Sequence, residues 1–415
     1  MKKHDHQLTR REFFSKGAAG VAAAGIWGKN AAKMLSAEPC GSFSRPRQEN
    51  KPIYRTLGKT GIRLPVVNMG VMNASNPELV KRSYEMGVRH FDTAAYYQRG
   101  QNEAMVGKAI QELGVRDQVV IGTKVYVPHE QRPRMSTAEL KKFFLDTAEE
   151  SLRRLRTDVI DIFYVHNVQD LDYLNNPGIK EALQILKENG KARYIGCSVH
   201  TNMTELVPDA VRCGFYEVLA VAFNYSMADD HDLKGALKKA HAKGIGLIAM
   251  KTQCMQYWYR ESVPSEKQQY YEGNVLQTAV LKWALRHEFI TCAIPGYTNF
   301  EQMEEDISVA SDLEYTAEEK RFLEDRGVKV ALMSYCRQCG NCLSTCPKGV
   351  DIPALMRTHL YAVCYANYDQ ARQTIRGISN DRGLNACACC EDCSVRCLRR
   401  VPVERRLCEL RMIYG

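Results

Sequence analysis

From residue 66 onward, short apolar runs alternate with stretches of helical periodicity, and this alternation limits the folds that the chain can adopt. Strands that alternate with helices build a parallel sheet with helical crossovers. Eight strands are expected, at residues 66–71, 88–92, 119–124, 160–166, 194–198, 218–224, 245–250 and 290–294. Eight such units predict an α/β fold of the (β/α)8 TIM-barrel type, in which functional residues lie at the carboxyl ends of the strands.

Local signals at three places support this reading. Ser136-Thr-Ala-Glu139 is a capping box, which marks the start of a helix. Thr316-Ala-Glu-Glu319 is a second capping box, and it predicts a helix that leads out of the barrel into the tail. Upstream, residues 52–64 alternate on both sides of a glycine-containing turn, a pattern that predicts a hairpin.

Four polar residues lie at or just beyond the ends of the second, third and fourth expected strands. Asp92 ends the second strand, Tyr97 follows on its loop, Lys124 ends the third strand and His166 ends the fourth. Neighbouring parallel strands would bring these side chains into one site. The alternative is a buried ion pair beside a core tyrosine and a core histidine.

The motifs around these four residues resemble the Asp, Tyr, Lys, His tetrad of the aldo-keto reductases. The resemblance covers about residues 52–310 and places the hairpin at the bottom of the barrel. It implies an enzyme that interconverts a small carbonyl compound and an alcohol. Tyr97 would donate the proton, Lys124 would lower the pKa of the phenol, Asp92 would hold the lysine, and His166 would orient the carbonyl or relay the proton.

The same resemblance implies NAD(P)(H) as a cofactor, although the sequence departs from the family pattern. Methionine occupies position 250, where an aromatic side chain usually stacks on the nicotinamide, and Gln302 stands where an arginine would bind the 2′-phosphate. A preference for NADP is therefore in doubt. The remaining dinucleotide contacts that the resemblance implies are Ser198, Asn224, Gly296, Glu305 and Asp306.

A long loop at residues 252–273 follows the seventh expected strand and carries several aromatic residues. It fits an active-site lid that walls the substrate, and it equally fits a packed surface loop, because long loops in barrels serve both purposes.

Eleven of the sixteen cysteines lie after residue 335, which indicates a local cysteine-rich site and not a disulfide framework for the whole chain. They include two runs with the spacing C-x2-C-x2-C-x3-C, at Cys336–Cys346 and Cys387–Cys397. A single run of this kind could arise by chance or bind zinc.

Two such runs in tandem resemble a ferredoxin that holds two [4Fe–4S] clusters, of the mainly helical type. In that arrangement the fourth cysteine of each run ligates the other cluster. One cluster would then be held by Cys336, Cys339, Cys342 and Cys397. The second would be held by Cys346, Cys387, Cys390 and Cys393. Cys389 is surplus, as are Cys364 and Cys408, which we expect to be buried apolar residues.

The first 37 residues resemble a twin-arginine export signal. Arg10 and Arg11 precede a weakly apolar run at residues 17–28, which is shorter than the roughly 20 residues that span a bilayer. We therefore expect a periplasmic or extracytoplasmic protein without a transmembrane span in the mature chain; the alternative is a basic amphipathic start that stays in the cytosol. The expected organisation is an export signal at 1–37, a linker at 38–51, a barrel at 52–315 and a tail at 316–415.

The net charge of +9 does not indicate nucleic acid as a partner, because residues 1–37 alone carry +5 of it. The leading hypothesis is an oxidoreductase in which electrons pass to or from the two clusters and from there to a redox partner protein. The alternative is an electron-transfer iron–sulfur protein whose barrel binds a ligand or partner without hydride chemistry.

Overall fold

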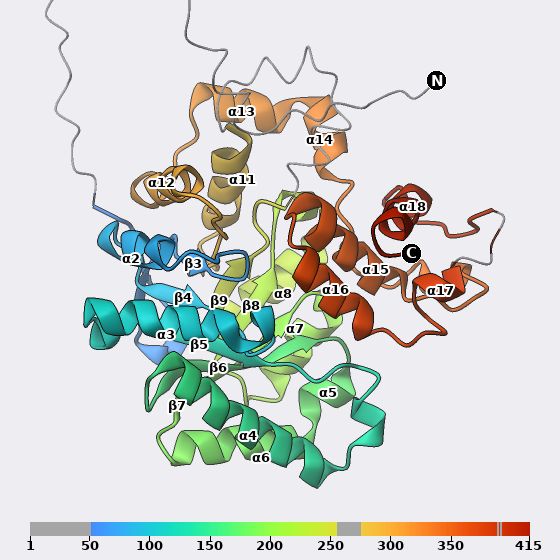
Figure 1. Ribbon diagram of the computed structural model, residues 1–415. Helices are drawn as coiled ribbons and strands as arrows, with labels where there is room; N and C mark the ends of the chain where they lie inside the picture. Colours follow the sequence, from blue (N-terminus) through green and yellow to red (C-terminus); the bar gives the residue numbers. More distant parts are fainter. Residues whose placement is uncertain (1–50, 255–274, 388–389, 391) are drawn as a thin grey trace, which may run out of the picture. The chain divides into compact units, whose positions relative to one another are not determined.

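The eight predicted strands form one parallel sheet in sequence order, as the computed structural model shows (Figure 1). They are β3 (Met69–Gly70), β4 (His90–Asp92), β5 (Val120–Val125), β6 (Ile160–Val168), β7 (Ala192–Val199), β8 (Val218–Ala222), β9 (Gly246–Met250) and β10 (Cys292–Ala293). The sheet closes where Val67 bridges Ala293, and the amide of Asn68 donates to the Ala293 carbonyl at 2.9 Å. The predicted parallel α/β barrel is therefore confirmed.

The structure describes residues 51–254, 275–387, 390 and 392–415. The expected export signal lies outside these residues, as do nearly all of the 252–273 loop and Cys389. Within the described ranges, no helix combines the length and the apolar character needed to cross a membrane.

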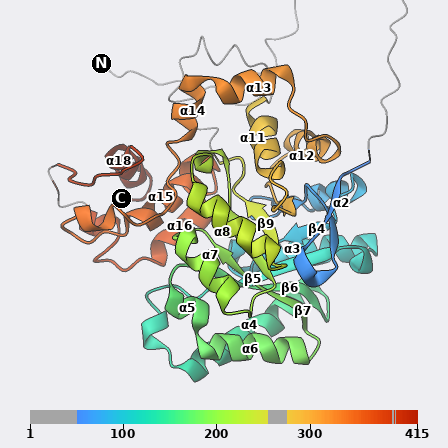
Figure 2. The same cartoon turned by 180° about the vertical axis from the view of Figure 1, so that it is seen from behind.

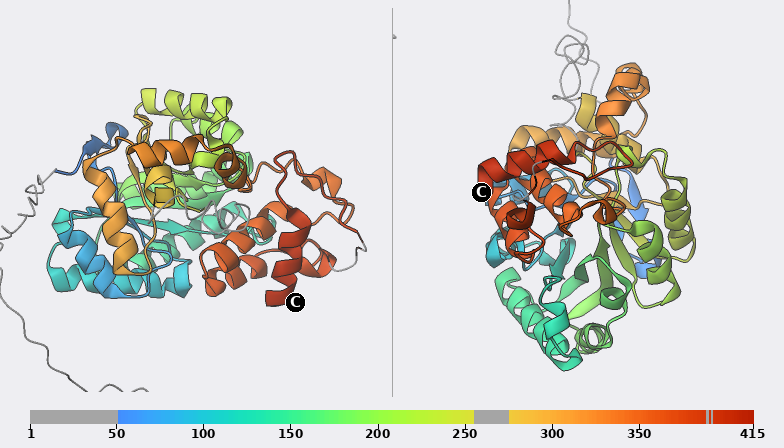
Figure 3. Two further views of the ribbon diagram at one scale, coloured as in Figure 1. Left: turned by 90° about the horizontal axis from the view of Figure 1, so that it is seen from above. Right: turned by 90° about the vertical axis from the view of Figure 1, so that its right-hand side faces the viewer.

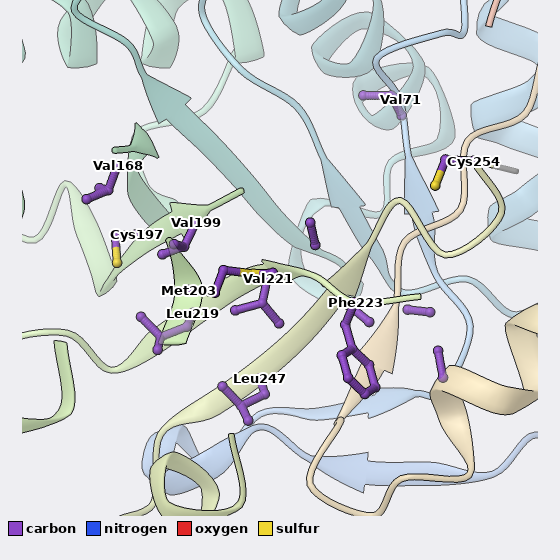
Figure 4. Packing of buried hydrophobic residues seen from close by; sticks show 14 of the residues in the cluster. Val71, Val168, Cys197, Val199, Met203, Leu219, Val221, Phe223, Leu247 and Cys254 are labelled. Atoms are coloured by element: carbon purple, nitrogen blue, oxygen red, sulfur yellow. The ribbon is translucent and has the colours of Figure 1, made fainter. Parts of the chain in front are cut away.

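Helices surround the sheet, as the front and back views show (Figures 1 and 2). They are α2 (Pro77–Glu85), α3 (Gln101–Leu113), α4 (Thr137–Leu155), α5 (Leu171–Asn175), α6 (Pro177–Glu188), α7 (Met203–Arg212), α8 (His231–Ala242), α11 (Val275–Leu285) and α12 (Phe300–Ser308). Alternate residues of each strand serve the two sides of the sheet. Leu219 and Val221 of β8 belong to the larger apolar cluster, seen in part in Figure 4, whereas Val218 and Ala220 belong to a second, smaller cluster.

The predicted hairpin is present as β1 (Tyr54–Thr56) and β2 (Arg63–Pro65). Leu57 and Leu64 of the hairpin are fully buried in the smaller cluster with side chains from β6, β8 and β9. At the turn, Gly58 has a φ of +53°, and a side chain there would meet the backbone of the segment that leads into β9. The hairpin thus packs against the first residues of the strands, at the end of the barrel opposite the tetrad.

The regular structure in the described part of the tail is helical. It comprises α13 (Ala317–Glu324), α14 (Arg326–Leu332), α15 (Ile352–His359), the π-helical turn η8 (Leu360–Cys364), α16 (Tyr368–Arg376), α17 (Leu384–Cys387) and α18 (Val403–Tyr414). The capping box at Thr316 is present and opens α13 as predicted. Cys408 is exposed, so the expectation that it is a buried apolar residue was wrong.

The tail packs on loops that follow the barrel strands. Asn367 donates to the side chain of Asn73, beyond β3, at 2.9 Å. Arg337 and Arg399 pair with Asp230 and Asp229 beyond β8, at 3.2 and 2.9 Å respectively. The red helices of the tail lie together at one side of the barrel in Figure 3, and residues Asn50–Gly415 form one unit by their contacts. The tail therefore lies over the carboxyl end of the strands.

Candidate active site

A buried ion pair forms the base of the site. Lys124 of β5 donates from Nζ to Asp92 of β4 and, at 2.7 Å, to the backbone carbonyl of Thr93. Both side chains are almost completely buried. Burial lowers the pKa of Lys124, and Asp92 partly offsets this effect. The two residues lie on adjacent strands of the sheet, as their positions at strand ends predicted.

Tyr164 of β6 lies beneath the lysine, with the ammonium 5.5 Å from its ring centroid. A side chain at Gly196 of β7 would come within 2.5 Å of that ring, so this position leaves room only for glycine. The hydroxyl of Tyr164 is buried and has no hydrogen-bond partner among the described residues. The small neighbour and the large ring together form the floor under the ion pair.

Tyr97 opens a short 3-10 turn, η2 (Tyr97–Gly100), directly after β4. The next two residues, Gln98 and Arg99, have left-handed φ values of 48° and 54°, a strained conformation for side chains of this kind. Behind the turn, Asn102 donates to the backbone carbonyls of Val71 and Ala74 at 2.8 and 3.1 Å. This bonding fixes the loop that carries the tyrosine.

Tyr97 and His166 face one another across the mouth of the barrel. Their ring centroids are 5.6 Å apart at an interplanar angle of 84°. Both side chains line a cavity of about 30 Å³. Burial lowers the pKa of His166 well below its usual value, and nearby Lys124 and Arg357 act in the same direction. His166 is therefore neutral in this site, and its Nδ1 has no partner among the described residues.

The pKa of Tyr97 is shifted in the direction opposite to the expectation. Lys124 Nζ lies 5.5 Å from the centroid of the Tyr97 ring. Burial raises the pKa of Tyr97 well above its usual value, and Asp92 and Tyr361 add to this shift. The lysine was expected to lower this pKa, but its charge is directed at Asp92. The tyrosine is accordingly a protonated phenol in this structure.

A larger cavity, of about 200 Å³, extends from Asp92 and Tyr97 to the first turns of α12. Three of the five predicted dinucleotide contacts line it, namely Gly296, Glu305 and Asp306. The other two make hydrogen bonds elsewhere. The hydroxyl of Ser198 accepts from the Asn167 amide at 2.8 Å, and Asn224 caps the turn at Ser226.

Two of the three carboxyl groups that line this cavity, those of Glu305 and Asp306, hold protons at unusually high pH. Burial raises the pKa of Asp306 to about 8, and Gln253 donates to the same side chain. Burial and the neighbouring Glu301 raise the pKa of Glu305 to about 7. Gln302 also lines the cavity, and it accepts from the amide and the hydroxyl of Thr298, each at 2.9 Å.

Four further residues in the site were missed at the sequence level. His200 follows β7 and Lys251 follows β9, so their positions at strand ends could have pointed to them. Arg357 and Tyr361 come from the tail, where no local pattern marked them. Tyr361 lines both cavities, and Lys251 donates to its hydroxyl at 3.1 Å.

The first predicted set of cysteines gathers at the start of the tail. Burial raises the pKa of Cys336 to about 12, and nearby Cys342 and Cys397 contribute in the same direction. Burial likewise raises the pKa of Cys342 to about 11, with contributions from Cys397 and Cys339. The four thiols therefore influence one another although Cys397 comes from the second run.

The second predicted set surrounds a cavity of about 120 Å³, lined by Cys346, Cys387, Cys390 and Cys393. Arg411 of α18 also lines this cavity and donates to the Cys387 sulfur at 2.9 Å. Over the described part of the chain, which excludes Cys389, no three His, Cys, Asp or Glu side chains are arranged closely enough to hold a metal ion.

Comparison with known proteins agrees with the barrel geometry. Residues 68–272 match the family model described as the aldo/keto reductase family. The L-glyceraldehyde 3-phosphate reductase of Escherichia coli O157:H7 is 24% identical over 67% of this chain and 93% of its own length. The L-galactose dehydrogenase of Arabidopsis thaliana is 26% identical over 63% of this chain and 88% of its own length.

Among solved structures, the holo form of the aldo-keto reductase AKR11C1 from Bacillus halodurans superposes with a TM-score of 0.53. It is 20% identical and covers 66% of this chain and 96% of its own, which supports the fold alone. Together with the family match and the reductases and dehydrogenases among its relatives, these findings show that the barrel is an aldo/keto reductase family domain and that the protein is an oxidoreductase.

Proposed function

We propose that the barrel interconverts a small carbonyl compound and the corresponding alcohol at Asp92, Tyr97, Lys124 and His166. The observation that carries this proposal is the buried Asp92–Lys124 pair beneath a protonated Tyr97, which shares a cavity with a neutral His166. A protonated phenol can give a proton to a carbonyl oxygen, and a neutral imidazole can donate a hydrogen bond that orients it. The ammonium of Lys124 is paired with Asp92 before the reaction, but it lies 5.5 Å from the ring centroid of Tyr97 and is the cation beside the phenolate that would form.

We propose a nicotinamide dinucleotide as the cofactor, held by Gly296, Glu305 and Asp306 in the larger cavity. When bound, the nicotinamide supplies or accepts the hydride. Besides Asp92, the wall contains the carboxyl groups of Glu305 and Asp306 and the amide of Gln302, and no Lys or Arg other than Lys251 lines this cavity among the described residues. A carboxyl group suits the ribose hydroxyls of NADH better than an additional phosphate, so we propose that NADH is preferred.

We propose that the tail binds two [4Fe–4S] clusters, one at Cys336, Cys339, Cys342 and Cys397, the other at Cys346, Cys387, Cys390 and Cys393. Thiolate chemistry, the doubled spacing and the cavity that the second set lines support this assignment. When bound, each cluster exchanges one electron, and two clusters match the two electrons of a hydride. Arg411 would donate to a ligating sulfur, an interaction that raises the reduction potential of a cluster.

We also propose that residues 1–37 direct export by the twin-arginine route. That route carries folded proteins, which suits a chain that assembles its cofactors before export. An external redox partner would then exchange electrons with the clusters.

One anaerobic experiment tests the catalytic and the cluster proposals together. The purified protein is titrated with NADH and with NADPH while cofactor fluorescence and cluster absorbance are followed, and iron, sulfide and zinc are analysed in the same sample. We expect about eight iron and eight sulfide per chain, and bleaching of the clusters by NADH. Zinc in place of iron would overturn the cluster assignment. Clusters that are not reduced by either nucleotide, in a protein without carbonyl reductase activity, would favour the electron-transfer alternative.

A further inference from the structure

The junction of the barrel and the tail contains two cations that no carboxylate neutralises within the described ranges. Arg357 of α15 and Lys251 beyond β9 make no ion pair with any of the described carboxylates. Tyr361, one helical turn beyond Arg357, lies between them in the π-helical turn η8. Interruptions of this kind in an α-helix are frequent at functional sites.

Arg357 is the more deeply buried of the two cations, with 7% of its surface exposed. One of its terminal nitrogens, Nη1, donates to the Gln338 side chain at 2.8 Å, whereas Nε and Nη2 are left without a partner among these residues. The guanidinium contributes to the wall of the smaller cavity, together with Tyr97 and His166. A buried charge without a counter-ion is unfavourable, and an anion in the cavity would reduce that cost.

The surroundings contribute no competing negative charge. Asp92 does not line the smaller cavity and is paired with Lys124; apart from Arg357, the described residues that line this cavity are tyrosines, histidines, amides and a threonine. Burial lowers the pKa of His200 well below its usual value, and Lys251 and Arg357 lower it further. Burial alone would raise the pKa of Tyr361, but Lys251, Arg357 and Lys124 together lower it below the usual value of a phenol. The positive potential of these cations therefore extends across the cavity.

The size of the cavity limits the kind of anion. A water-sized group occupies about 10 to 15 Å³ by this measure, so about 30 Å³ accommodates roughly two such groups. A carboxylate presents two oxygens in one plane, which matches the planar fork of a guanidinium.

We propose that the substrate of the barrel carries a carboxylate, that Arg357 of the tail binds this group, and that Tyr97 and His166 receive the carbonyl beside it. This inference rests on the proposed carbonyl chemistry and adds to it the class of substrate, an oxo acid or the matching hydroxy acid. Lys251 holds the Tyr361 hydroxyl, and the tyrosine forms the wall between the substrate cavity and the larger cofactor cavity. The tail thus supplies a specificity-determining residue to the barrel.

Equilibrium binding of oxamate to the anaerobic full-length protein tests the carboxylate site without any turnover. Oxamate is an unreactive analogue of a 2-oxo acid, and calorimetry gives its Kd. We expect Arg357→Gln to weaken binding by about thirty-fold or more, the scale for loss of one member of a buried charge pair. Arg357→Lys keeps the charge and should restore part of the affinity. Arg376→Gln removes an exposed arginine from the neighbouring helix α16 and should bind as the native protein does.

Three results would overturn the proposal: no binding of oxamate to the native protein, equal binding to Arg357→Gln, or binding of inorganic phosphate that depends on Arg357 while oxamate does not bind. Cluster absorbance and circular dichroism identify a variant that fails to fold. If Arg357→Gln does not fold, the oxamate Kd of Arg357→Lys is compared with that of Arg376→Gln.

Steady-state reduction of an oxo acid and of its methyl ester separates this inference from the proposed reaction. The native protein should favour the acid, and Arg357→Gln should lose that preference because kcat/KM falls much more for the acid than for the ester. If oxamate binds through Arg357 but no carbonyl compound is reduced, the carboxylate site stands and the proposed reaction fails.

Discussion

At the scale of single residues, Lys124 does not lower the pKa of Tyr97, although their placement near the ends of neighbouring strands suggested that it would. The lysine donates to Asp92 and to a backbone carbonyl, and burial keeps the Tyr97 phenol protonated. A phenol with a raised pKa holds its proton firmly until a carbonyl oxygen that gains negative charge can accept it. This state suits the reduction direction, in which the tyrosine must start protonated.

We therefore expect Tyr97→Phe to lower carbonyl reduction by about a hundred-fold or more, the usual scale for loss of a general acid. Tyr164→Phe is the matched control, because its ring centroid also lies 5.5 Å from Lys124 Nζ but the residue lines neither of the two cavities at the barrel mouth. Initial rates with NADH at neutral pH provide the measurement. Full activity in Tyr97→Phe would mean that the proton comes from another group.

Lys124→Met should destabilise the barrel, because it leaves Asp92 buried without its cation. Breaking one side of a buried pair costs about 3 to 5 kcal/mol. The double variant Asp92→Asn/Lys124→Met removes both charges and should recover part of that loss. Urea denaturation followed by tryptophan fluorescence measures all three proteins, and equal midpoints for the single and the double variant would show that the pair is not coupled.

At the scale of elements, α12 bears on the choice of cofactor. Gln302 lies in the cofactor cavity at the position where the family resemblance implies an arginine. We expect Gln302→Arg to tighten NADPH binding by about ten-fold or more, because a charge-assisted hydrogen bond contributes about 1.5 to 3 kcal/mol. NADH affinity should change little. Fluorescence titration gives both constants, and an equal gain for NADH would place the 2′-phosphate elsewhere.

The same helix should make stability depend on pH. The pKa of Asp306 is raised from 3.8 to about 8 in the folded barrel, so the folded state binds a proton that the unfolded chain has already lost in this range. Stability should therefore fall as the pH rises from about 4 to about 8. Asp306→Asn should flatten this dependence, which thermal denaturation at a series of pH values would reveal. An unchanged pH profile would assign the effect to other groups.

Most elements were predictable because their signals are local. All eight strands were located from apolar runs, and the capping boxes at Ser136 and Thr316 do begin helices. The strand ends were less accurate at the seam, where β3 and β10 contain only two residues each, against the six and five expected. Strand length there depends on pairing between the two ends of the barrel domain, and a local pattern does not contain that information.

At the scale of the whole molecule, the junction between barrel and tail could not be predicted. The barrel repeat places the ends of neighbouring strands side by side. The proximity of Asp92, Tyr97, Lys124 and His166 therefore followed from their positions at or just beyond strand ends. Arg357 reaches the same cavity only because of the way the tail docks, through pairs such as Arg337 with Asp230. Such docking depends on how well the surfaces of the barrel and the tail fit each other. The sequence pattern of one does not reveal the surface of the other.

The proposed export signal has its own test at this scale. Replacing both Arg10 and Arg11 with lysine should leave the protein in the cytoplasm with its clusters intact, because the change lies outside the barrel and the tail. Cell fractionation followed by immunoblotting measures the distribution. Unchanged export would show that Arg10 and Arg11 do not direct it and that the protein does not use the twin-arginine route.

The pairing of Val67 with Ala293 also determines how long the first strand must wait for its partner during synthesis. The first barrel strand leaves the ribosome with one hydrogen-bonding edge bare, and its partner follows only after roughly 10 to 45 s at ordinary elongation rates. During that interval the nascent chain displays an open sheet edge, which invites pairing with other chains. Translation pauses or truncations between these two residues should therefore lead to aggregation, whereas truncations within the tail should leave a closed barrel.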